Sequence, residues 1–335
     1  RIARFCLAGD YNREMRLLSV LFAVLLLNVS QTGQGAVLAP FGTSTGSPTQ
    51  VRLGEEHVSR YKIGVVIQAV GGPCRGIIAT IPVPADWPEQ TVRIFDEDVS
   101  ANVGQVSYQM LEGGVKQMVI SIVLLQGGDE AHAMVTVEVN RRTLIAPEDT
   151  SQFVLPKQMD RQTRRFLAPS PYIESRHGRI RKLAKEITKD QESAWEKVES
   201  IYDWVRENVD YQNGKLKGAL AALRDGTGDC EELTSLFIAL CRANGIPART
   251  VWVPGHCYPE FYLADEMKQG HWIPCQAAGS HSFGGIVEQR PVLQKGDNFR
   301  VPGSRTVQRY VAEKLKVAAA TGKPAVRFVR ENMAE

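Results

Sequence analysis

The chain lacks the features that would place it in several common classes of protein. Its 335 residues carry 40 basic and 37 acidic side chains, a net charge of +3, and contain no long run of one charge sign. So small an excess does not predict a nucleic-acid surface. The sequence also has no CxxC pair, no Cys/His cluster at the spacing of metal ligands and no calcium-binding loop, so we expect neither a metal nor another cofactor.

The sequence also lacks an apolar run long enough for a transmembrane helix, because Leu17–Leu27 is shorter than the roughly 20 residues that such a helix needs. Arg13 and Arg16 precede this run, and small and polar residues follow it as far as Ala39. The pattern is typical of a secretory signal peptide, predicted over residues 1–39 with Met15 as the start. The alternative is an uncleaved N-terminal anchor. Both place the body of the protein in the periplasm or outside the cell, with no other membrane contact.

Cysteine is scarce, with six residues in the chain. Cys6 would be removed with the signal peptide, which leaves five cysteines in an oxidising compartment. Because five is an odd number, at least one thiol must stay free, as a cysteine enzyme requires.

Composition divides the rest of the chain into segments. Residues 40–56 are rich in Gly, Ser, Thr and Pro and predict a linker. Residues 57–150 predict a β-sandwich, because short apolar and β-branched stretches alternate there with glycine-containing turns. The expected strands are Ile63–Val70, Gly76–Val83, Val92–Phe95, Val106–Leu111, Val119–Leu125 and Met134–Val139.

Residues 151–187 are predicted to form a connector and residues 188–335 a second domain, because helical periodicity appears toward the end of the connector. Arg179–Ile187 predicts a short helix. Thr188 and Gln191 predict the capping box of a second helix, along which apolar residues share one face. A last helix is expected over Thr306–Ala320, packed against the core.

A tight polar turn, Asp225–Asp229, leads directly into Cys230. After it, apolar residues recur at the spacing of a helix face as far as Cys241, and Asn244-Gly245 predicts the end of the helix. Cys230 therefore begins an amphipathic helix, where free backbone N–H groups and the helix dipole lower the pKa of a thiol. Cys241 lies on the apolar face, where burial makes a thiol unreactive.

Strands are predicted after this helix at Arg249–Val253, Gly255–Leu263 and His271–Gln276. If the last two strands pair, His256 meets Gln276, whose side chain would orient the imidazole. A cysteine, a histidine and an orienting group together form the arrangement of thiol-based acyl-transfer enzymes.

Three motifs in this region resemble the transglutaminase-like superfamily: Gly228-Asp229-Cys230 with the following Leu240–Arg249, then His256–Glu260, and Trp272–Gln276. The resemblance covers residues 188–276. It implies an α+β fold, with a papain-like transglutaminase core preceded by the N-terminal β-sandwich, and it makes residues 188–335 the catalytic domain. It also implies Cys230 as the nucleophile, His256 as the general base and Gln276 as the third catalytic residue.

Gln276 departs from the family pattern, which has Asp and sometimes Asn at this position. An amide oxygen can accept the imidazole N–H, but it does not neutralise an imidazolium as a carboxylate does. An active Cys–His pair with an orienting amide and an inactive site therefore both remain open. Asp265, in the turn after the strand that carries His256, is the alternative carboxylate.

Neighbouring residues have simpler interpretations. Cys257 should point away from His256 and serve packing, although a disulfide with Cys275 on the next strand stays open. We expect Trp252 to help the backbone N–H groups at the helix start to stabilise an oxyanion. His271 is expected to be structural.

The predicted chemistry is acyl transfer on peptide or protein amides. The Cys230 thiolate attacks the carbonyl, His256 takes and returns the proton, and a thioester forms. Water as the acceptor gives a protease or amidase, which we favour, and an amine gives a cross-linking enzyme. The alternative from another class is a catalytically inactive binding or scaffold protein of the cell envelope.

Overall fold

The computed structural model describes residues 51–333. The predicted signal peptide and most of the predicted linker lie outside the described residues. Within residues 51–333, none of the helices is both long and apolar enough to cross a membrane.

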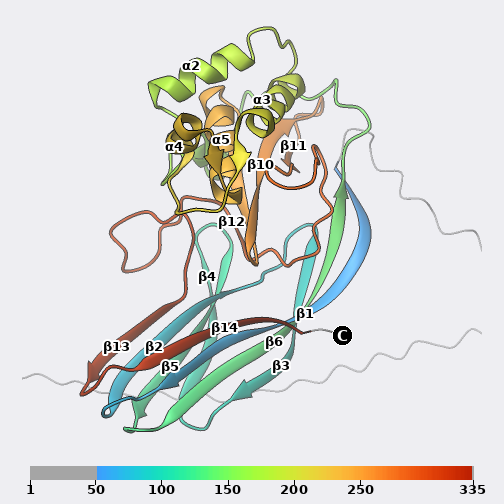
Figure 1. Ribbon diagram of the computed structural model, residues 1–335. Helices are drawn as coiled ribbons and strands as arrows, with labels where there is room; N and C mark the ends of the chain where they lie inside the picture. The colour runs from blue at the N-terminus through green and yellow to red at the C-terminus, as the bar shows by residue number, and fades with distance from the viewer. Residues whose placement is uncertain (1–50, 334–335) are drawn as a thin grey trace, which may run out of the picture. The chain divides into compact units, whose positions relative to one another are not determined.

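The first six strands follow one another along the chain and belong to two four-stranded antiparallel sheets (Figure 1). One sheet has the order β14-β1-β6-β3 and the other β13-β2-β5-β4. All six predicted strands are confirmed, although the first begins inside the stretch that was predicted as a linker. Their bounds are β1 Arg52–Gln68, β2 Cys74–Val83, β3 Gln90–Val99, β4 Gln105–Leu111, β5 Val115–Leu125 and β6 Glu130–Ile145.

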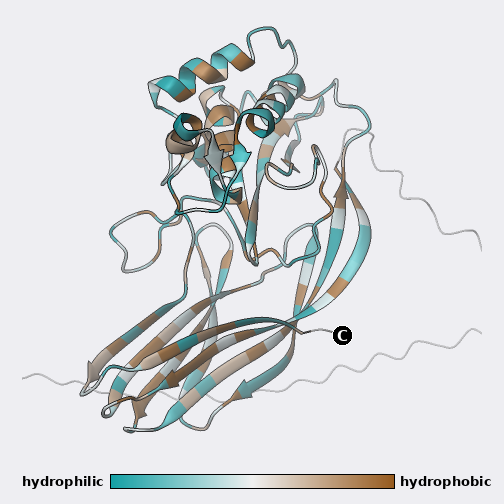
Figure 2. Ribbon diagram, viewed as in Figure 1, coloured by the Kyte–Doolittle hydropathy of each residue, from teal (hydrophilic) through white to brown (hydrophobic). Residues whose placement is uncertain are grey.

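The side chains of these strands alternate between a shared core and the surface. In β6, Val135, Val137 and Val139 are buried, while the intervening Thr136 and Glu138 are only half-buried. Inward side chains of β1, β2, β5 and β6 form one hydrophobic cluster, and Figure 2 shows the alternating hydropathy along the strands. This two-residue period is what a sheet with one buried face requires. The two sheets therefore form the expected β-sandwich.

The last two strands of the sandwich come from the C-terminal part of the chain. β13 (Lys314–Ala320) pairs antiparallel with β2, and β14 (Ala325–Met333) pairs antiparallel with β1. The helix predicted over Thr306–Ala320 is therefore wrong. Leu315 and Val317 are half-buried and alternate with exposed residues, which is the period of a strand. The edge of β2 is available to pair with them. Residues 314–333 complete the sandwich rather than the catalytic domain to which they were assigned.

The middle of the chain contributes the helices. The helix predicted at Arg179–Ile187 is confirmed, but the predicted capping box is wrong. Ser193 and Glu196 form the box that starts the next helix, whereas Thr188 ends the previous one by bonding back to Ala184. The bounds are α1 Arg161–Arg164, α2 Gly178–Ile187, α3 Ala194–Asn208, α4 Ala219–Asp225 and α5 Cys230–Ala243, with a 3₁₀ turn at Arg165–Leu167 after α1.

A third four-stranded sheet, of order β11-β10-β9-β12, accompanies these helices. Its bounds are β9 Ala248–Val253, β10 His256–Ala264, β11 Gly270–Pro274 and β12 Gln294–Lys295; a short parallel pair, β7 Asp210–Tyr211 and β8 Thr227–Gly228, precedes α5. Helix α5 packs against β9 and β10 and against α2, α3 and α4, and every residue from Glu232 to Arg242 is buried. The most buried helix of this α+β core is thus the one that begins with Cys230.

Candidate active site

Local sequence sets the start of α5 at Cys230. The Asp229 side chain accepts a hydrogen bond from the backbone N–H of Glu231 at 2.8 Å, and Glu232 bonds back to the N–H of Asp229 at 3.3 Å. The Asp229 side chain also accepts from the backbone N–H of Glu232, so Asp229 and Glu232 form a capping box. Gly228 is required just before it, because a Cβ there would overlap the side chain of Glu232. The Gly-Asp-Cys sequence therefore makes the helix begin at the cysteine.

Glu232 also joins this helix to the preceding loop. Its carboxylate is buried and accepts hydrogen bonds from the backbone N–H groups of Lys217, at 2.8 Å, and Gly218, at 3.4 Å. A carboxylate in the first turn complements the helix dipole, as the sequence suggested. The structure adds that the same side chain fixes the loop before α4.

His256 and Gln276 meet as the sequence predicted. β10 and β11 pair with Glu260 opposite Pro274, so Gln276, two residues beyond β11, lies near His256 at the start of β10. His256 Nε2 is 3.0 Å from Gln276 Oε1, and Arg206 of α3 donates to the backbone carbonyl of Gln276 at 2.9 Å. Since an amide oxygen only accepts, Nε2 carries the proton of the neutral ring and Nδ1 is left to act as a base toward Cys230.

The electrostatics of the pair favour a thiolate. Hydrogen bonds from the side chain of Cys257 and from His256 outweigh the effect of burial and lower the pKa of Cys230 to about 5. Burial acts to lower the pKa of His256, but its hydrogen bonds to Cys230 and Gln276 prevail and raise it. Between these two pKa values, the thiolate–imidazolium pair is the favoured form. Burial raises the pKa of Cys241, as expected for an unreactive thiol.

Cys257 has a role that the sequence interpretation missed. Cys257 is buried, its Sγ lies 3.5 Å from the backbone carbonyl oxygen of Cys230, and its side chain lowers the pKa of the Cys230 thiol. Cys257 thus contacts the start of α5. Alternation along a strand carried no information about which helix packs against this residue.

Three further expectations are corrected by the structure. Asp265 accepts a hydrogen bond from His271 at 2.8 Å, so it is the partner of a structural histidine and not of His256. Cys257 and Cys275 are both free thiols, so they form no disulfide. The indole N–H of Trp252 donates to the carbonyl of Gly296 at 2.8 Å, so it is not available to an oxyanion.

Arg309 is a second residue near the site that no sequence motif indicated. Its guanidinium lies 4.7 Å from the ring centre of Trp252 and pairs with Glu231, the residue that follows Cys230. It belongs to the stretch that was predicted to be helical. Because the chain instead runs past Trp252 before it enters β13, tertiary structure alone brings Arg309 to the start of α5.

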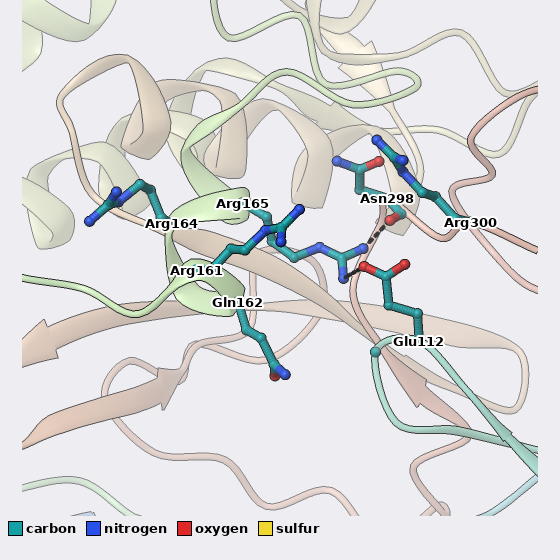
Figure 3. Close-up of a pocket in the computed structure, with 8 residues that line it drawn as sticks. Glu112, Arg161, Gln162, Arg164, Arg165, Asn298 and Arg300 are labelled. Atoms are coloured by element: carbon teal, nitrogen blue, oxygen red, sulfur yellow. Dashed lines mark hydrogen bonds and ion pairs between the residues drawn. The ribbon is translucent and has the colours of Figure 1, made fainter.

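A cavity of about 670 Å³ is not lined by Cys230, His256 or Gln276 (Figure 3). Four of its eight lining residues are arginines, which come from α1, from the 3₁₀ turn and from the loop after β12. The thiol and this cavity are therefore separate features of the molecule.

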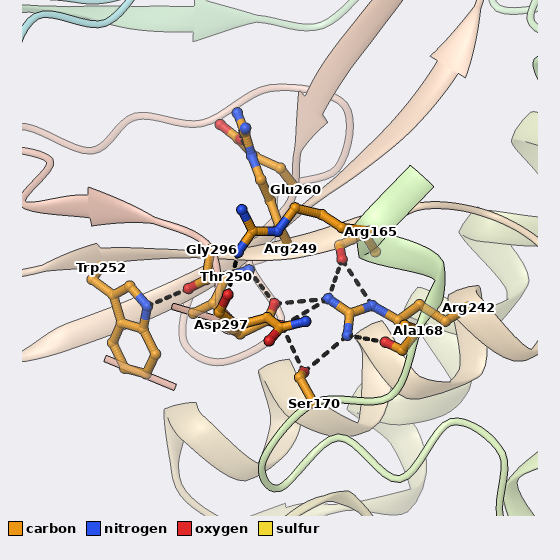
Figure 4. Close-up of polar contacts among 12 residues, drawn as sticks. Arg165, Ala168, Ser170, Arg242, Arg249, Thr250, Trp252, Glu260, Gly296 and Asp297 are labelled. Carbon is orange, nitrogen blue, oxygen red and sulfur yellow. Dashed lines mark hydrogen bonds and ion pairs between the residues drawn. The ribbon is translucent and has the colours of Figure 1, made fainter. Parts of the chain in front are cut away.

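A buried polar network holds the other end of α5 (Figure 4). Arg242 Nη2 donates to both carboxylate oxygens of Asp297, at 2.9 and 2.8 Å, and Ser170 donates to the same carboxylate at 2.6 Å. Arg242 and Asp297 are at most 1% exposed. A buried charge that lost this partner would destabilise the fold strongly, so the network fixes how α5 lies on β9.

The fold and the site together define a papain-like core with a cysteine at a helix N-terminus and a histidine on the adjacent sheet. Residues 181–277, which include Cys230, His256 and Gln276, match the Transglutaminase-like superfamily. This part of the chain is therefore a transglutaminase-like domain.

Individual relatives are distant. An uncharacterized protein of Haemophilus influenzae is 25% identical over 183 residues, which cover 43% of this chain and 48% of the relative. The chain thus spans about half the length of that relative. A candidate cysteine protease from Cytophaga hutchinsonii shares the fold, with a TM-score of 0.52 at 19% identity over 84% of this chain and 93% of that one. The periplasmic domain of TgpA from Pseudomonas aeruginosa, bound to ethylmercury, gives a TM-score of 0.34 at 15% identity over 69% and 91% of the two chains.

Proposed function

We propose that the protein is an exported thiol hydrolase that cleaves peptide or protein amides through a Cys230 thioester. The observation that supports this most directly is the pairing of His256 with Gln276, whose Oε1 lies 3.0 Å from the imidazole Nε2, together with the influence of His256 on Cys230, whose pKa it helps to lower. An orienting amide in place of a carboxylate still sets the ring tautomer and direction.

The proposed reaction begins from the thiolate–imidazolium pair. Cys230 Sγ attacks the amide carbonyl, and the backbone N–H groups at the start of α5 stabilise the oxyanion that forms. The His256 imidazolium donates its Nδ1 proton to the leaving amine, which leaves a thioester on Cys230. Neutral His256 then deprotonates a water molecule, which releases the carboxylate product and restores the thiol.

The proposal also specifies water, rather than an amine, as the acyl acceptor. The fold is shared with a candidate cysteine protease, which favours hydrolysis over cross-linking as an assignment for this chain. Export is likewise proposed on the pattern of charged and apolar residues before Ala39.

The first experiment is alkylation by iodoacetamide between pH 4 and 9, with mass spectrometry to locate the modified cysteine. With a thiol pKa of about 5, the labelling rate of Cys230 should rise through pH 5 and reach its plateau below pH 7. In His256→Ala the loss of the imidazolium should move this rise toward the free-thiol value of about 8.5. Cys241 is the internal control, because its buried thiol should stay unlabelled in the folded protein.

A second measurement separates the two acyl acceptors. The enzyme is incubated with a quenched glutamine-containing peptide and a fluorescent primary amine, and both cleavage and amine incorporation are followed. Peptide cleavage that disappears in Cys230→Ala supports hydrolysis, whereas amine incorporation without cleavage assigns cross-linking. If Cys230 is labelled only above about pH 8 and neither product forms, the enzyme proposal is wrong and the protein is an inactive binding protein.

A further inference from the structure

The arginine-lined cavity of about 670 Å³ lies among three segments that are distant in sequence (Figure 3). Glu112 and Gly113 come from the turn between β4 and β5. Arg161, Gln162, Arg164 and Arg165 come from α1 and the 3₁₀ turn, and Asn298 and Arg300 from the loop that leads toward β13. The volume falls within the range of roughly 300–1,000 Å³ that is typical of small-ligand sites.

The charge of this lining is strongly unbalanced. Four arginines face one carboxylate, Glu112. Only Arg165 is neutralised within the cavity, since its Nη1 lies 3.1 Å from Glu112 Oε1 and its other amino group donates to the carbonyl of Asn298. Arg161 and Arg300 have exposed side chains, and neither pairs with a carboxylate among residues 51–333. Arg164 contributes less, because it donates to the carbonyl of Met159 and extends away from the other guanidinium groups in Figure 3.

This arrangement carries a modest repulsion that a bound anion would remove. Arg161 and Arg165 are four residues apart in continuous helical backbone, where two like charges repel each other. A guanidinium is planar and presents paired N–H donors, which match the two oxygens of a carboxylate or phosphate group. Binding an anion would therefore satisfy donors that the protein leaves to solvent and would remove the repulsion.

A second cavity of about 610 Å³ borders the first and suggests a ligand with more than one charge. The two cavities share Gly113, Arg161, Gln162 and Arg165, and the charged residues that the second adds are Asp160, Arg249 and Lys295. Both added cations already pair with the buried Glu260, at 2.8 Å and 2.6 Å. The unpaired positive charge therefore belongs to the first cavity, near Arg161, Arg165 and Arg300, and the second cavity extends the volume that a ligand could fill.

We propose that Arg161, Arg165 and Arg300 form a binding site for an oligoanion that carries phosphate or carboxylate groups. The site is separate from the Cys230 thiol and does not depend on the function proposed for it.

The test is isothermal titration calorimetry of the protein with two probes, inorganic tripolyphosphate and a trigalacturonate, at low salt. Saturable binding of either probe is expected at micromolar to millimolar concentration, and the tighter probe identifies whether phosphate or carboxylate is preferred. The Arg161→Gln/Arg300→Gln double variant should weaken binding by about tenfold or more, because two charge-assisted contacts are lost. Glu112→Gln should tighten binding, since it removes the carboxylate that competes for Arg165.

Arg327→Gln is the matched control, because it removes the same charge from an exposed position on β14 outside both cavities. Its affinity should stay within about twofold of that of the parent protein. Thermal unfolding of each variant verifies that the fold is kept. Equal weakening in Arg327→Gln and in the double variant would mean that net charge alone attracts the probes, and no saturable binding of either probe would also overturn the proposal.

Discussion

At the scale of single residues, the Cys230 sulfur is surrounded by donors on β10. The pKa of about 5 arises first from the Cys257 side chain, with further hydrogen bonds from His256 and from the Cys257 backbone N–H. The Cys257 thiol has one proton and two acceptors within reach, the carbonyl oxygen of Cys230 at 3.5 Å and its sulfur. A hydrogen bond to an anion is stronger than one to a neutral group, so ionisation of Cys230 should draw that proton to the sulfur.

The change Cys257→Ala should therefore raise the pKa of Cys230. Loss of one charge-assisted hydrogen bond predicts a shift of about one pH unit in the alkylation profile of Cys230. Cys257→Ser keeps a hydroxyl donor and should lie closer to the parent protein. The profile is measured with iodoacetamide on each folded variant.

Cys241→Ala is the control for this comparison, since it removes another buried thiol from the same core without touching the donors on β10. Its alkylation profile should match that of the parent protein. If Cys257→Ala also leaves the profile unmoved, the Cys257 thiol merely fills space.

At the scale of elements, the candidate site depends on where two elements begin: α5 begins at Cys230 and β10 begins at His256. Sequence patterns were informative about α5 because its capping and apolar face are local properties. They were misleading for residues 306–320, where the lysines and apolar residues of β13 fit a helix until the edge of β2 is considered. An edge strand pairs with whatever the fold places beside it, and no local propensity encodes that.

Asp229→Ala should loosen the first turn of α5. Loss of an N-cap side chain typically costs about 1 kcal/mol in the free energy of unfolding, and Asp229→Asn should lose less because an amide oxygen still caps. Urea unfolding measures the stability, and hydrogen exchange should show faster exchange at the amides of Glu231 and Glu232.

Ser193→Ala is the matched control, since Ser193 caps α3 with the same type of bond, at 3.1 Å to the N–H of Glu196. It should cost a similar free energy while the amides at the start of α5 exchange as before. Equal exchange at α5 in Asp229→Ala and Ser193→Ala would contradict a local role of Asp229.

At the scale of the whole molecule, buried ion pairs join the core to the strand β12. Glu260 of β10 is 1% exposed and accepts bonds from Lys295 of β12 and Arg249 of β9. Burial acts to raise the pKa of Glu260, but the charges of Lys295 and Arg249 outweigh it and lower the pKa from its ordinary 4.5 to about 2. A carboxylate whose pKa is lowered by folding stabilises the protein above its unfolded pKa, and that contribution disappears as it is protonated.

Acid should therefore destabilise the protein between pH 4.5 and 2, with Glu260 contributing on the order of 3 kcal/mol to the loss. Glu260→Gln should lower the free energy of unfolding at pH 7 by about 3 kcal/mol, because the Arg249 guanidinium, whose side chain is only 14% exposed, loses its charge partner, while Lys295 keeps its pairing with Glu89. It should also flatten the pH dependence within that window. Urea unfolding followed at several pH values measures both effects.

Glu138→Gln provides the comparison, because Glu138 also pairs with two arginines, Arg60 and Arg93, but on the surface of the sandwich. Solvent screens such pairs, so this variant should change the stability far less. A loss in Glu138→Gln as large as that in Glu260→Gln would show that burial is not the cause.

Short-range patterns were sufficient for the strands of the sandwich and for α5. A helix cap, an apolar stripe and strand alternation depend on neighbours within a few residues, so they can be read along the chain. The contact of Cys257 with Cys230, the position of Arg309, the arginine-lined cavity and the return of β13 and β14 to the sandwich each join segments far apart in sequence. Packing decides those contacts, because the strand edge, helix start or carboxylate that a residue meets belongs to another part of the chain.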